Sequence, residues 1–300
     1  MTRLDFTDRV VIVTGAGRGL GRAYAELLAA RGAAVVVNDL GGAVDGTPRD
    51  EDPAAEAVAA ITGAGGRAVA STASVATEEG AEAIVATAIS AFGRLDAVVN
   101  NAGIYSVRPW LELPASKYQD FLDVHYLGSV RVSRAAWPHL VASGQGRIVN
   151  TVSAAMLGVP DMVHYGSAKG AVYGLTRNLA VAGHAHGIRV NAIAPGAGTR
   201  MMDEAKDALP PGTAEFMKEH MPPSMVAPVA AYLAHDDCAV TGEVFNVAGG
   251  AVSRLVVGST AGISDPGLTP ETVAERLGEI LAVDRVEPAE LMLPTPAAGA

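Results

Sequence analysis

The sequence predicts an α/β fold in which a parallel sheet is covered by helices on both faces. Short β-branched segments alternate with longer Ala- and Leu-rich segments through the first 250 residues, as in strand–helix–strand units. The apolar runs at 10–13 (Val-Val-Ile-Val) and 34–37 (Ala-Val-Val-Val) lack polar alternation, which is expected of strands that are buried on both faces. With 49% hydrophobic residues, a chain of 300 residues can bury a large core.

Strands are expected where β-branched residues cluster, and helices are expected in the longer segments between them. The expected strands are Val10–Thr14, Ala34–Asn38, Ala68–Ser71, Ala97–Asn100, Arg147–Thr151, Arg189–Ala194 and Val244–Val247. The expected helices are Gly19–Arg31, Ala54–Thr62, Glu78–Phe92, Tyr118–Val141, Val163–His184 and Met225–His235.

Two segments interrupt this alternation. Residues Gly41–Pro53 are Gly-rich and acidic, and they predict an exposed loop after the second strand. Residues Gly196–Ser224 are rich in Met, Pro and charged side chains. Their methionines are consistent with loose packing or with a pliable apolar lid that selects the substrate.

The alternation ends after Gly250, so we divide the chain into a domain at 1–250 and a C-terminal extension at 251–300. The extension carries one expected amphipathic helix, which Thr269 would cap and which Pro270 would open. Its apolar stripe consists of Val273, Leu277, Ile280 and Leu281. The sequence leaves open whether this helix covers its own active site, docks on a neighbouring subunit or forms a loosely held tail.

The charge and composition exclude several classes of partner. A net charge of −10 disfavours nucleic acid and anionic membranes, which both attract basic proteins. The single cysteine, Cys238, rules out an internal disulfide framework. We find no apolar run near the length of about 18 residues that spans a membrane, and no secretory or peroxisomal signal. These features predict a soluble cytoplasmic protein.

A glycine-rich turn joins the first strand to the first helix and predicts a dinucleotide site. Glycines there let a pyrophosphate approach backbone N–H groups at the helix N-terminus. The expected contacts are Gly15, Arg18, Gly19, Leu20 and Gly21.

The choice between NAD and NADP depends on Asp39, which follows the second strand and lies 18 residues after Gly21. A carboxylate at this place accepts hydrogen bonds from the adenosine ribose and repels a 2′-phosphate. Arg18 favours the alternative, because a guanidinium in the glycine turn could bind that phosphate. Since Asp39 would lie on the ribose itself, we predict NAD.

Tyr165 and Lys169 lie four residues apart in an expected helix and therefore share one face. A free phenol, with a pKa of about 10, is a poor acid–base catalyst at neutral pH. A neighbouring ammonium favours the phenolate and should lower that pKa. The pair is a candidate for proton transfer.

Five ordered motifs resemble the short-chain dehydrogenase/reductase family over about residues 6–250: Thr14–Gly21, Asn100–Gly103, Ser153, Tyr165 with Lys169, and Pro195-Gly196. The resemblance implies a single Rossmann-like, doubly wound domain with a seven-stranded parallel sheet. It implies that Lys169 also holds the nicotinamide ribose. The further cofactor contacts that it implies are Asn101, Ala102, Gly103, Pro195, Gly196 and Thr199. It also implies a homodimer or homotetramer that uses the two longest helices as its interface.

Within the family, the chain most resembles the (3R)-hydroxyacyl-CoA dehydrogenase domain of peroxisomal multifunctional enzyme type 2. The similar segments are Val37–Gly42, Val124–Gly128, Arg134–Trp137, Ile193–Met201 and Val226–Pro228.

The chain departs from the usual family pattern at three places. His125 stands where most members have an asparagine that supports a proton-relay water, so it either substitutes in that relay or packs a helix. Ser153 precedes Tyr165 by 12 residues, one fewer than the commonest spacing, which suggests a shortened loop. Ser74-Val75 replaces an Asp-Val pair that usually holds the adenine edge, so adenine contact should be weaker.

These residues predict an NAD-dependent enzyme that oxidises a secondary alcohol, with a (3R)-hydroxyacyl-CoA or related thioester as the expected substrate. Tyr165 would move the alcohol proton, and Ser153 would stabilise the developing alkoxide. The phosphates of CoA need cations, for which Arg108, Arg200, Lys206, Lys218 and Arg254 are candidates.

Several alternatives stay open. The chain could be an NADP-dependent ketoreductase, a hydroxysteroid or other secondary alcohol dehydrogenase, or a sensor that binds NAD without catalysis. We expect no metal site, because His184 and His186 lack a third ligand at suitable spacing.

Overall fold

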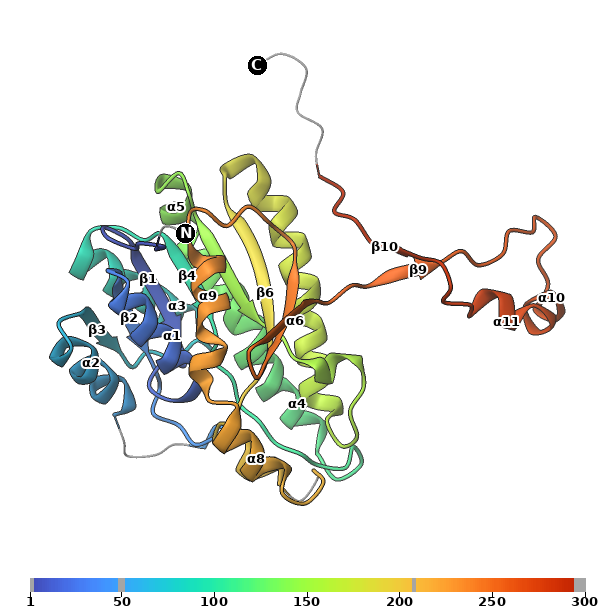
Figure 1. Cartoon of the computed structure of the whole chain (residues 1–300), viewed down its shortest axis with the longest axis horizontal. Coiled ribbons are helices and arrows are strands. Elements are labelled where there is room, and N and C mark those ends of the chain that lie inside the picture. Colours follow the sequence, from blue (N-terminus) through green and yellow to red (C-terminus); the bar gives the residue numbers. More distant parts are fainter. Residues whose placement is uncertain (1–2, 48–51, 207–208, 294–300) are drawn as a thin grey trace, which may run out of the picture.

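The computed structural model describes residues 3–47, 52–206 and 209–293. Its centre is an eight-stranded sheet in the order β3-β2-β1-β4-β5-β6-β7-β8, in which β8 alone runs antiparallel (Figure 1). The strands are β1 (Val10–Thr14), β2 (Ala34–Asn38), β3 (Arg67–Ser71), β4 (Ala97–Asn100), β5 (Arg147–Thr151), β6 (Arg189–Gly196), β7 (Val244–Ala248) and β8 (Ala251–Arg254). The predicted α/β class is confirmed, and the strand order reverses between β1 and β4, where such sheets bind ligands.

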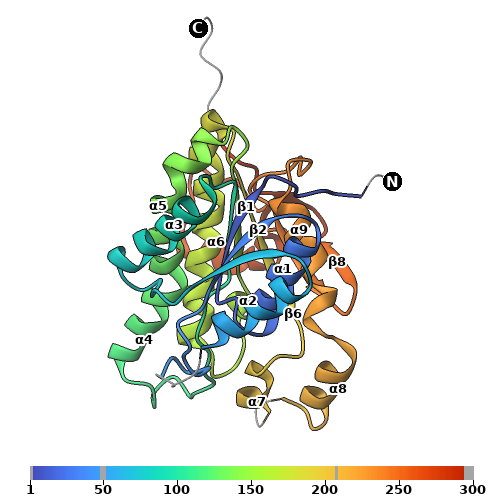
Figure 2. The same cartoon turned by 90° about the vertical axis from the view of Figure 1, so that its left-hand side faces the viewer.

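Helices cover both faces of this sheet (Figure 2). One layer contains α1 (Gly19–Ala30), α2 (Pro53–Gly63) and α9 (Ala227–Ala234), and the other contains α3 (Glu78–Phe92), α5 (Gly128–Ala142) and α6 (Val163–Gly183). Alternate residues of each strand serve the two layers: Val11 and Val13 pack against the first, and Val10 and Ile12 against the second. This explains why the strand sequences show no polar alternation.

The helix expected at 118–141 is longer and is not uniform. It consists of α4 (Ala115–Phe121), a π-helical turn η1 (Leu122–Leu127) and α5. The wider turn carries His125, which is 2% exposed and faces the interior. Such π-helical turns commonly occur at functional sites. The helix expected at Met225–His235 is a 3-10 turn, η4 (Pro223–Met225), followed by α9.

The sheet continues beyond the boundary that we set at residue 250. Gly249 and Gly250 both have positive φ (54° and 82°) and form a two-residue hairpin turn between β7 and β8. Glycine suits such turns because the hairpin requires positive φ at both central residues. The seven predicted strands are therefore present, with an eighth, antiparallel strand from the part assigned to the extension.

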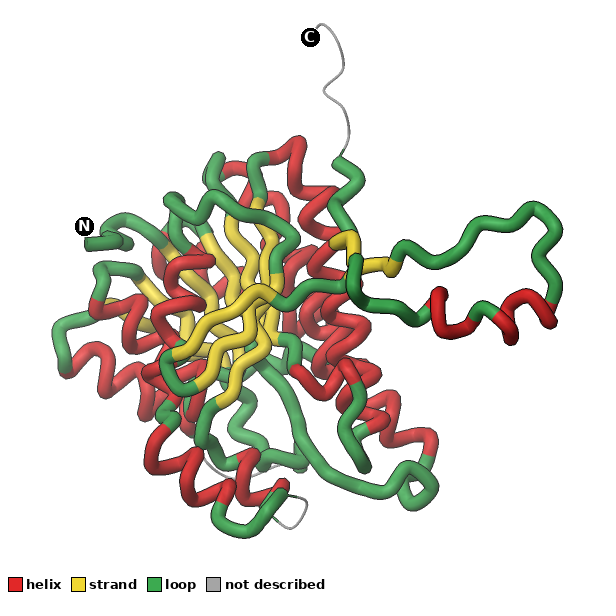
Figure 3. The backbone as a smooth tube through the Cα atoms, turned by 45° about the vertical axis from the view of Figure 1, so that its right-hand side comes forward, coloured by secondary structure: helices red, strands yellow, loops and turns green. Residues whose placement is uncertain are grey.

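Most of residues 255–293 form an arm that leaves the body (Figures 1 and 3), while Leu255 and Leu291 near its two ends pack against apolar clusters of the body. The base of the arm is a two-stranded ribbon of β9 (Gly258–Thr260) and β10 (Val286–Pro288), and its tip carries α10 (Pro270–Glu275) and α11 (Leu277–Ile280). Thr269 caps α10 as predicted, accepting a hydrogen bond from the Thr272 N–H (3.2 Å). The single expected helix is instead two short ones, and its stripe residues Leu277 and Leu281 are exposed.

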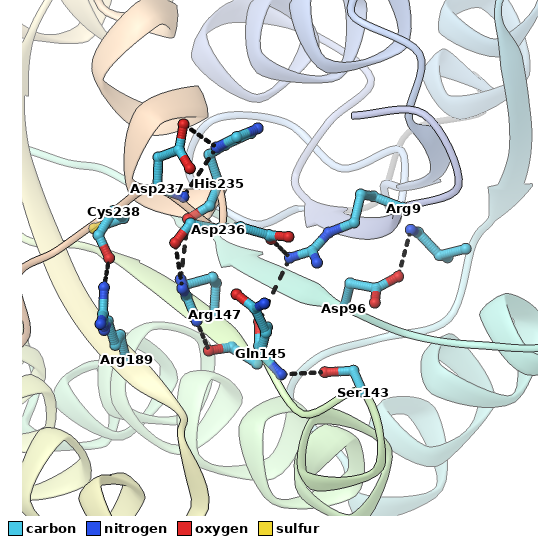
Figure 4. A network of polar contacts seen from close by, with 12 residues as sticks. Arg9, Asp96, Ser143, Gln145, Arg147, Arg189, His235, Asp236, Asp237 and Cys238 are labelled. Carbon is cyan, nitrogen blue, oxygen red and sulfur yellow. Dashed lines mark hydrogen bonds and ion pairs between the residues drawn. The ribbon is translucent and has the colours of Figure 1, made fainter. Parts of the chain in front are cut away.

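A polar network closes the edge of the sheet where the parallel strands begin (Figure 4). The buried guanidinium of Arg147 donates to the backbone oxygens of Gly146, His235 and Asp236. Arg9 pairs with Asp236, and Arg189 donates to the Cys238 carbonyl oxygen. The start of the sheet is thus tied to the segment after α9, which leaves the opposite edge open for a site.

In the part of the chain that the structure describes, no helix is long and apolar enough to cross a membrane.

Candidate active site

The glycine turn between β1 and α1 lies at the carboxyl edge of the sheet and presses closely on β4. A Cβ on Gly15, whose φ is +63°, would lie 2.8 Å from the Ala102 Cα, and a Cβ on Gly21 would lie 2.3 Å from the Gly15 oxygen. The Asn101 side chain donates to the Thr14 and Gly15 oxygens (2.9 and 3.0 Å). Only glycine fits this cradle, which the segment directly after β4 holds in place.

A cavity of about 640 Å³ opens above this turn, within the usual size range of cofactor pockets. Eleven predicted cofactor contacts line it: Gly15, Arg18, Gly19, Leu20, Asp39, Ser74, Val75, Asn101, Ala102, Gly103 and Thr199. Gly21, Pro195 and Gly196 do not line it. The arrangement fits the phosphates and adenosine half of a nicotinamide cofactor, which the closely packed glycine turn would accept at the N-terminus of α1.

The Asp39 carboxylate lies in the wall of this cavity. Its oxygens accept hydrogen bonds from the backbone N–H groups of Gly17 and Gly41 (both 2.9 Å). A carboxylate has further lone pairs with which to accept from ribose hydroxyls. Ser74 lies in the same wall, where its hydroxyl accepts from the Ala76 N–H (3.1 Å).

The loop after β2 is less exposed than we predicted. Residues 43–47 line the cavity, and the Val44 oxygen accepts a hydrogen bond from the Tyr105 N–H (2.8 Å). Val44 also packs against the apolar cluster that contains Tyr165. The loop therefore covers one side of the cofactor cavity; its residues 48–51 lie outside the described part of the chain.

The predicted catalytic residues meet at the same edge of the sheet. Ser153 follows β5, and Tyr165 and Lys169 lie in the first turns of α6. Lys169 is 3% exposed; its Nζ donates to the Thr151 oxygen (2.7 Å) and lies 5.6 Å from the centre of the Tyr165 ring. The Tyr165 hydroxyl bonds to the Ser153 side chain.

Burial controls the ionisation of this pair. It raises the pKa of Tyr165 to about 12, against the opposing effect of the Ser153 hydrogen bond. Burial also lowers the pKa of Lys169 to about 7. We had expected the ammonium to lower the phenol pKa, but desolvation outweighs that effect here. The phenol is therefore protonated at neutral pH and ready to donate a proton to a ketone.

His125 lies beside the tyrosine, with its ring edge-on to the Tyr165 ring at 5.3 Å. Its Nε2 contacts both the oxygen (2.8 Å) and the N–H (3.3 Å) of Ile104. Its buried Nδ1 has no partner among the described residues. Burial and the nearby Lys169 charge hold the pKa of His125 well below its usual value, so the imidazole is neutral. These contacts show the packing role, and the relay role stays a prediction.

The sequence analysis did not single out two residues of this site. Tyr105 packs edge-on against the Tyr165 ring (5.2 Å), and His164 directly precedes Tyr165 in α6. Tyr105 lies in an irregular loop that no motif marks. A histidine beside the predicted tyrosine was the one available cue for His164.

The cations proposed to receive CoA are only partly available. Lys218 pairs with Asp203, and Arg254 pairs with Glu243 (2.6 Å). Arg200 lines the cofactor cavity. The Met-rich segment folds into α7 (Met201–Ala205) and α8 (Thr213–His220). The two ends of this segment are held together by a hydrogen bond from the Gly198 N–H to the Met221 oxygen (2.8 Å).

His184 and His186 lie in the 3-10 turn η3 (His184–His186) after α6. Over residues 3–47, 52–206 and 209–293, no three His, Cys, Asp or Glu side chains form a group that could hold a metal ion.

The chain is similar to several known proteins. Residues 9–209 match the family described as short chain dehydrogenase. The chain is 44% identical to a Mycobacterium tuberculosis protein named as a short-chain type dehydrogenase/reductase, over 91% of this chain and 94% of that one. It is 40% identical to peroxisomal multifunctional enzyme type 2 of Mus musculus over 92% of this chain, and spans 37% of that protein.

A solved structure of 7α-hydroxysteroid dehydrogenase, complexed with NADH and 7-oxo glycochenodeoxycholic acid, is also similar. Its TM-score is 0.73 at 30% identity, over 84% of this chain and 98% of that one. The predicted family resemblance is confirmed.

Prediction for Lys169. Between about pH 7 and its ordinary pKa of 10.5, the unfolded chain binds a proton at Lys169 that the folded chain lacks. The free energy of unfolding should therefore rise with pH, by up to about 1.4 kcal/mol per pH unit. Tyr165 is protonated in both states below about pH 9 and adds no slope. Urea unfolding from about pH 6 to 9 should show this slope in the wild type and not in Lys169→Met. Parallel curves would mean that burial does not neutralise the lysine.

Proposed function

Since this chain belongs to the short-chain dehydrogenase/reductase family and is thus an enzyme that acts on a CH–OH group, we propose that it oxidises a secondary alcohol to a ketone with NAD. The substrate class that we propose is a (3R)-hydroxyacyl-CoA or a related hydroxyacyl thioester. The observation that carries the proposal is the convergence of Ser153, Tyr165 and Lys169 at the carboxyl edge of the sheet, the edge that also carries the glycine turn.

The reaction needs one proton transfer and one hydride transfer. In the oxidation, the phenolate of Tyr165 accepts the alcohol proton, and Ser153 donates a hydrogen bond to the alkoxide that develops. A nicotinamide cofactor, which the glycine turn and Asp39 would hold, would supply the acceptor for the hydride of the alcohol carbon. Because burial keeps the Tyr165 phenol protonated at neutral pH, the free site is set for the reverse step, in which the phenol protonates the ketone oxygen.

The proposed role of Lys169 follows from its place. Its Nζ donates to the Thr151 oxygen and lies 5.6 Å from the centre of the tyrosine ring. A protonated Lys169 would favour the phenolate form of Tyr165, so the protonation state of each group depends on that of the other. The neutral His125, with its unpartnered buried Nδ1, is a candidate to pass the proton onward.

The acyl-CoA class is supported by the similarity to peroxisomal multifunctional enzyme type 2. The ion pairs of Lys218 and Arg254 count against a strong phosphate site, because binding there would have to break them. A hydroxysteroid is the second candidate, favoured by the likeness to 7α-hydroxysteroid dehydrogenase.

Prediction for catalysis and substrate. Wild-type protein with NAD should oxidise (3R)-hydroxyacyl-CoA with a higher kcat/KM than free hydroxysteroids or simple secondary alcohols. Tyr165→Phe removes the proton acceptor and should lower kcat by at least about 100-fold, while the Kd for NAD changes little. Tyr173→Phe, on the same helix but outside the site, is the matched control. Retained turnover in Tyr165→Phe would remove this residue from proton transfer, and no CoA turnover would exclude the thioester.

Prediction for the cofactor. We expect the wild type to prefer NAD, because the Asp39 carboxylate would repel a 2′-phosphate in the cavity wall. Asp39→Asn keeps an oxygen that can accept from a backbone N–H but removes the negative charge. The variant should lower the ratio of kcat/KM with NAD to kcat/KM with NADP by about tenfold or more. Arg18→Ala should leave the preference in place. Equal turnover of both cofactors by the wild type would contradict the proposal.

Prediction for assembly. We propose that the protein is a homo-oligomer whose interface includes the arm and the outer surface of α5 and α6. Leu281, Val283 and Met292 in the arm are 64%, 76% and 91% exposed, which is costly for an isolated chain. A chain that ends at Val257 should form assemblies with fewer chains per particle in light scattering, or have a higher dissociation constant. Leu281→Ser with Val283→Ser should act in the same direction. An unchanged number of chains per particle and an unchanged dissociation constant in both variants would exclude the arm.

A further inference from the structure

The loop between β4 and α4 holds one side of the catalytic tyrosine. Residues 101–109 have no regular secondary structure, yet the Tyr105 ring lies edge-on to the Tyr165 ring at a centroid distance of 5.2 Å. The His125 ring contacts Tyr165 in the same edge-on manner (5.3 Å). Tyr165 is thus held between two rings, one on a helix and one on an irregular loop. Tyr105 can fix the position of the Tyr165 ring only if other contacts hold the loop in place.

That support comes from four contacts outside the loop. The His125 imidazole holds Ile104, the Val44 oxygen accepts from the Tyr105 N–H (2.8 Å), and the Asp161 oxygen accepts from the Arg108 N–H (2.9 Å). The fourth contact holds Ser106: the His164 Nε2 lies 3.0 Å from its hydroxyl and 3.1 Å from its carbonyl oxygen. Of these four, the contact to His164 begins on α6, the helix that carries Tyr165.

The surroundings of His164 make it a rigid support. The residue is 1% exposed, and its ring packs edge-on against Phe121 (4.5 Å). Burial lowers its pKa, which keeps the imidazole neutral. A neutral ring that carries its proton on Nε2 donates to the Ser106 oxygen. Because adjacent helix residues point in different directions, His164 faces the loop while Tyr165 faces the site.

We propose that His164 is a positioning residue for the reaction: by holding Ser106, it keeps Tyr105 against the Tyr165 ring and so sets the direction of the phenol hydroxyl. The inference rests on the proposed role of Tyr165 in proton transfer. A phenol rotates with its ring, and a misplacement of about 1 Å can slow a reaction by about 100-fold. His164 touches neither substrate nor cofactor in this account, and acts through Tyr105.

Single variants separate positioning from folding. His164→Leu removes the donor and should lower kcat by about tenfold or more, with the Kd for NAD and the melting temperature little changed. His164→Gln places an N–H at a similar reach and should restore most of the rate. Ser106→Ala keeps the carbonyl acceptor and should stay within about twofold of the wild type. A parallel loss of kcat and NAD binding in His164→Leu would indicate a purely structural role and overturn the proposal.

A double-mutant cycle tests the route through Tyr105. If His164 acts through that ring, the effects of Tyr105→Leu and His164→Leu on kcat should not add. Additive effects, or an unchanged kcat in His164→Leu, would overturn the inference. If His164→Leu does not fold, His164→Gln and Tyr105→Leu decide instead: Tyr105→Leu must lower kcat without weakening NAD binding, and an unchanged kcat there overturns the inference.

Hydrogen exchange provides a readout that does not need activity. Amide exchange of residues 104–106 should be faster in His164→Leu than in the wild type, and restored in His164→Gln. The proposed function fails separately, if the wild type oxidises none of the alcohols tested. Unchanged exchange at 104–106 would show that His164 does not hold the loop, whatever the substrate.

Discussion

Burial of the central sheet on both faces is the constraint on which the rest of this structure depends. Val11, Ile12 and Val13 of β1 are fully buried, and the neighbouring parallel strands are buried in the same way. Polar chemistry has no place along such strands and is confined to their ends. Ser153, Asp39 and the glycine turn accordingly follow β5, β2 and β1 at one edge, and the opposite edge is closed by the Arg147 network.

The same burial affects the ionisation of the side chains in the site. A buried hydrogen-bonded chain (2.9 and 3.0 Å) runs from Asn100 through Asn150 to Thr176 and joins β4 and β5 to α6. Tyr165 and Lys169 lie on the same helix, where desolvation favours the neutral form of both groups. The charged forms of Tyr165 and Lys169 are therefore disfavoured before a cofactor or substrate binds. Small changes in the position or polarity of neighbouring groups will change the protonation state of the pair.

Features that depend on neighbouring residues were predictable, and features that depend on distant contacts were not. The strands, the glycine turn and the Tyr165–Lys169 pair are set by spacing along one segment, and each lies where the sequence places it. The Gly249-Gly250 pair is a local hairpin signal at the boundary of the predicted domain, and it adds β8. The π-helical turn at His125 and the division of the 269–281 helix depend on packing, or its absence, which periodicity does not report.

The sequence by itself determined the α/β class and the glycine turn, and it singled out the candidate catalytic residues, because helical and strand periods and short motifs act over a few residues. Only the tertiary structure decided the ionisation of Tyr165 and Lys169, because desolvation depends on every segment packed around them. It alone brought Tyr105 and His125 against the tyrosine ring and Ser106 against His164, since loop positions follow from contacts between segments about 20 to 60 residues apart. The arm is also a feature that the sequence alone did not reveal. Its exposed apolar side chains are left uncovered within the described part of one chain.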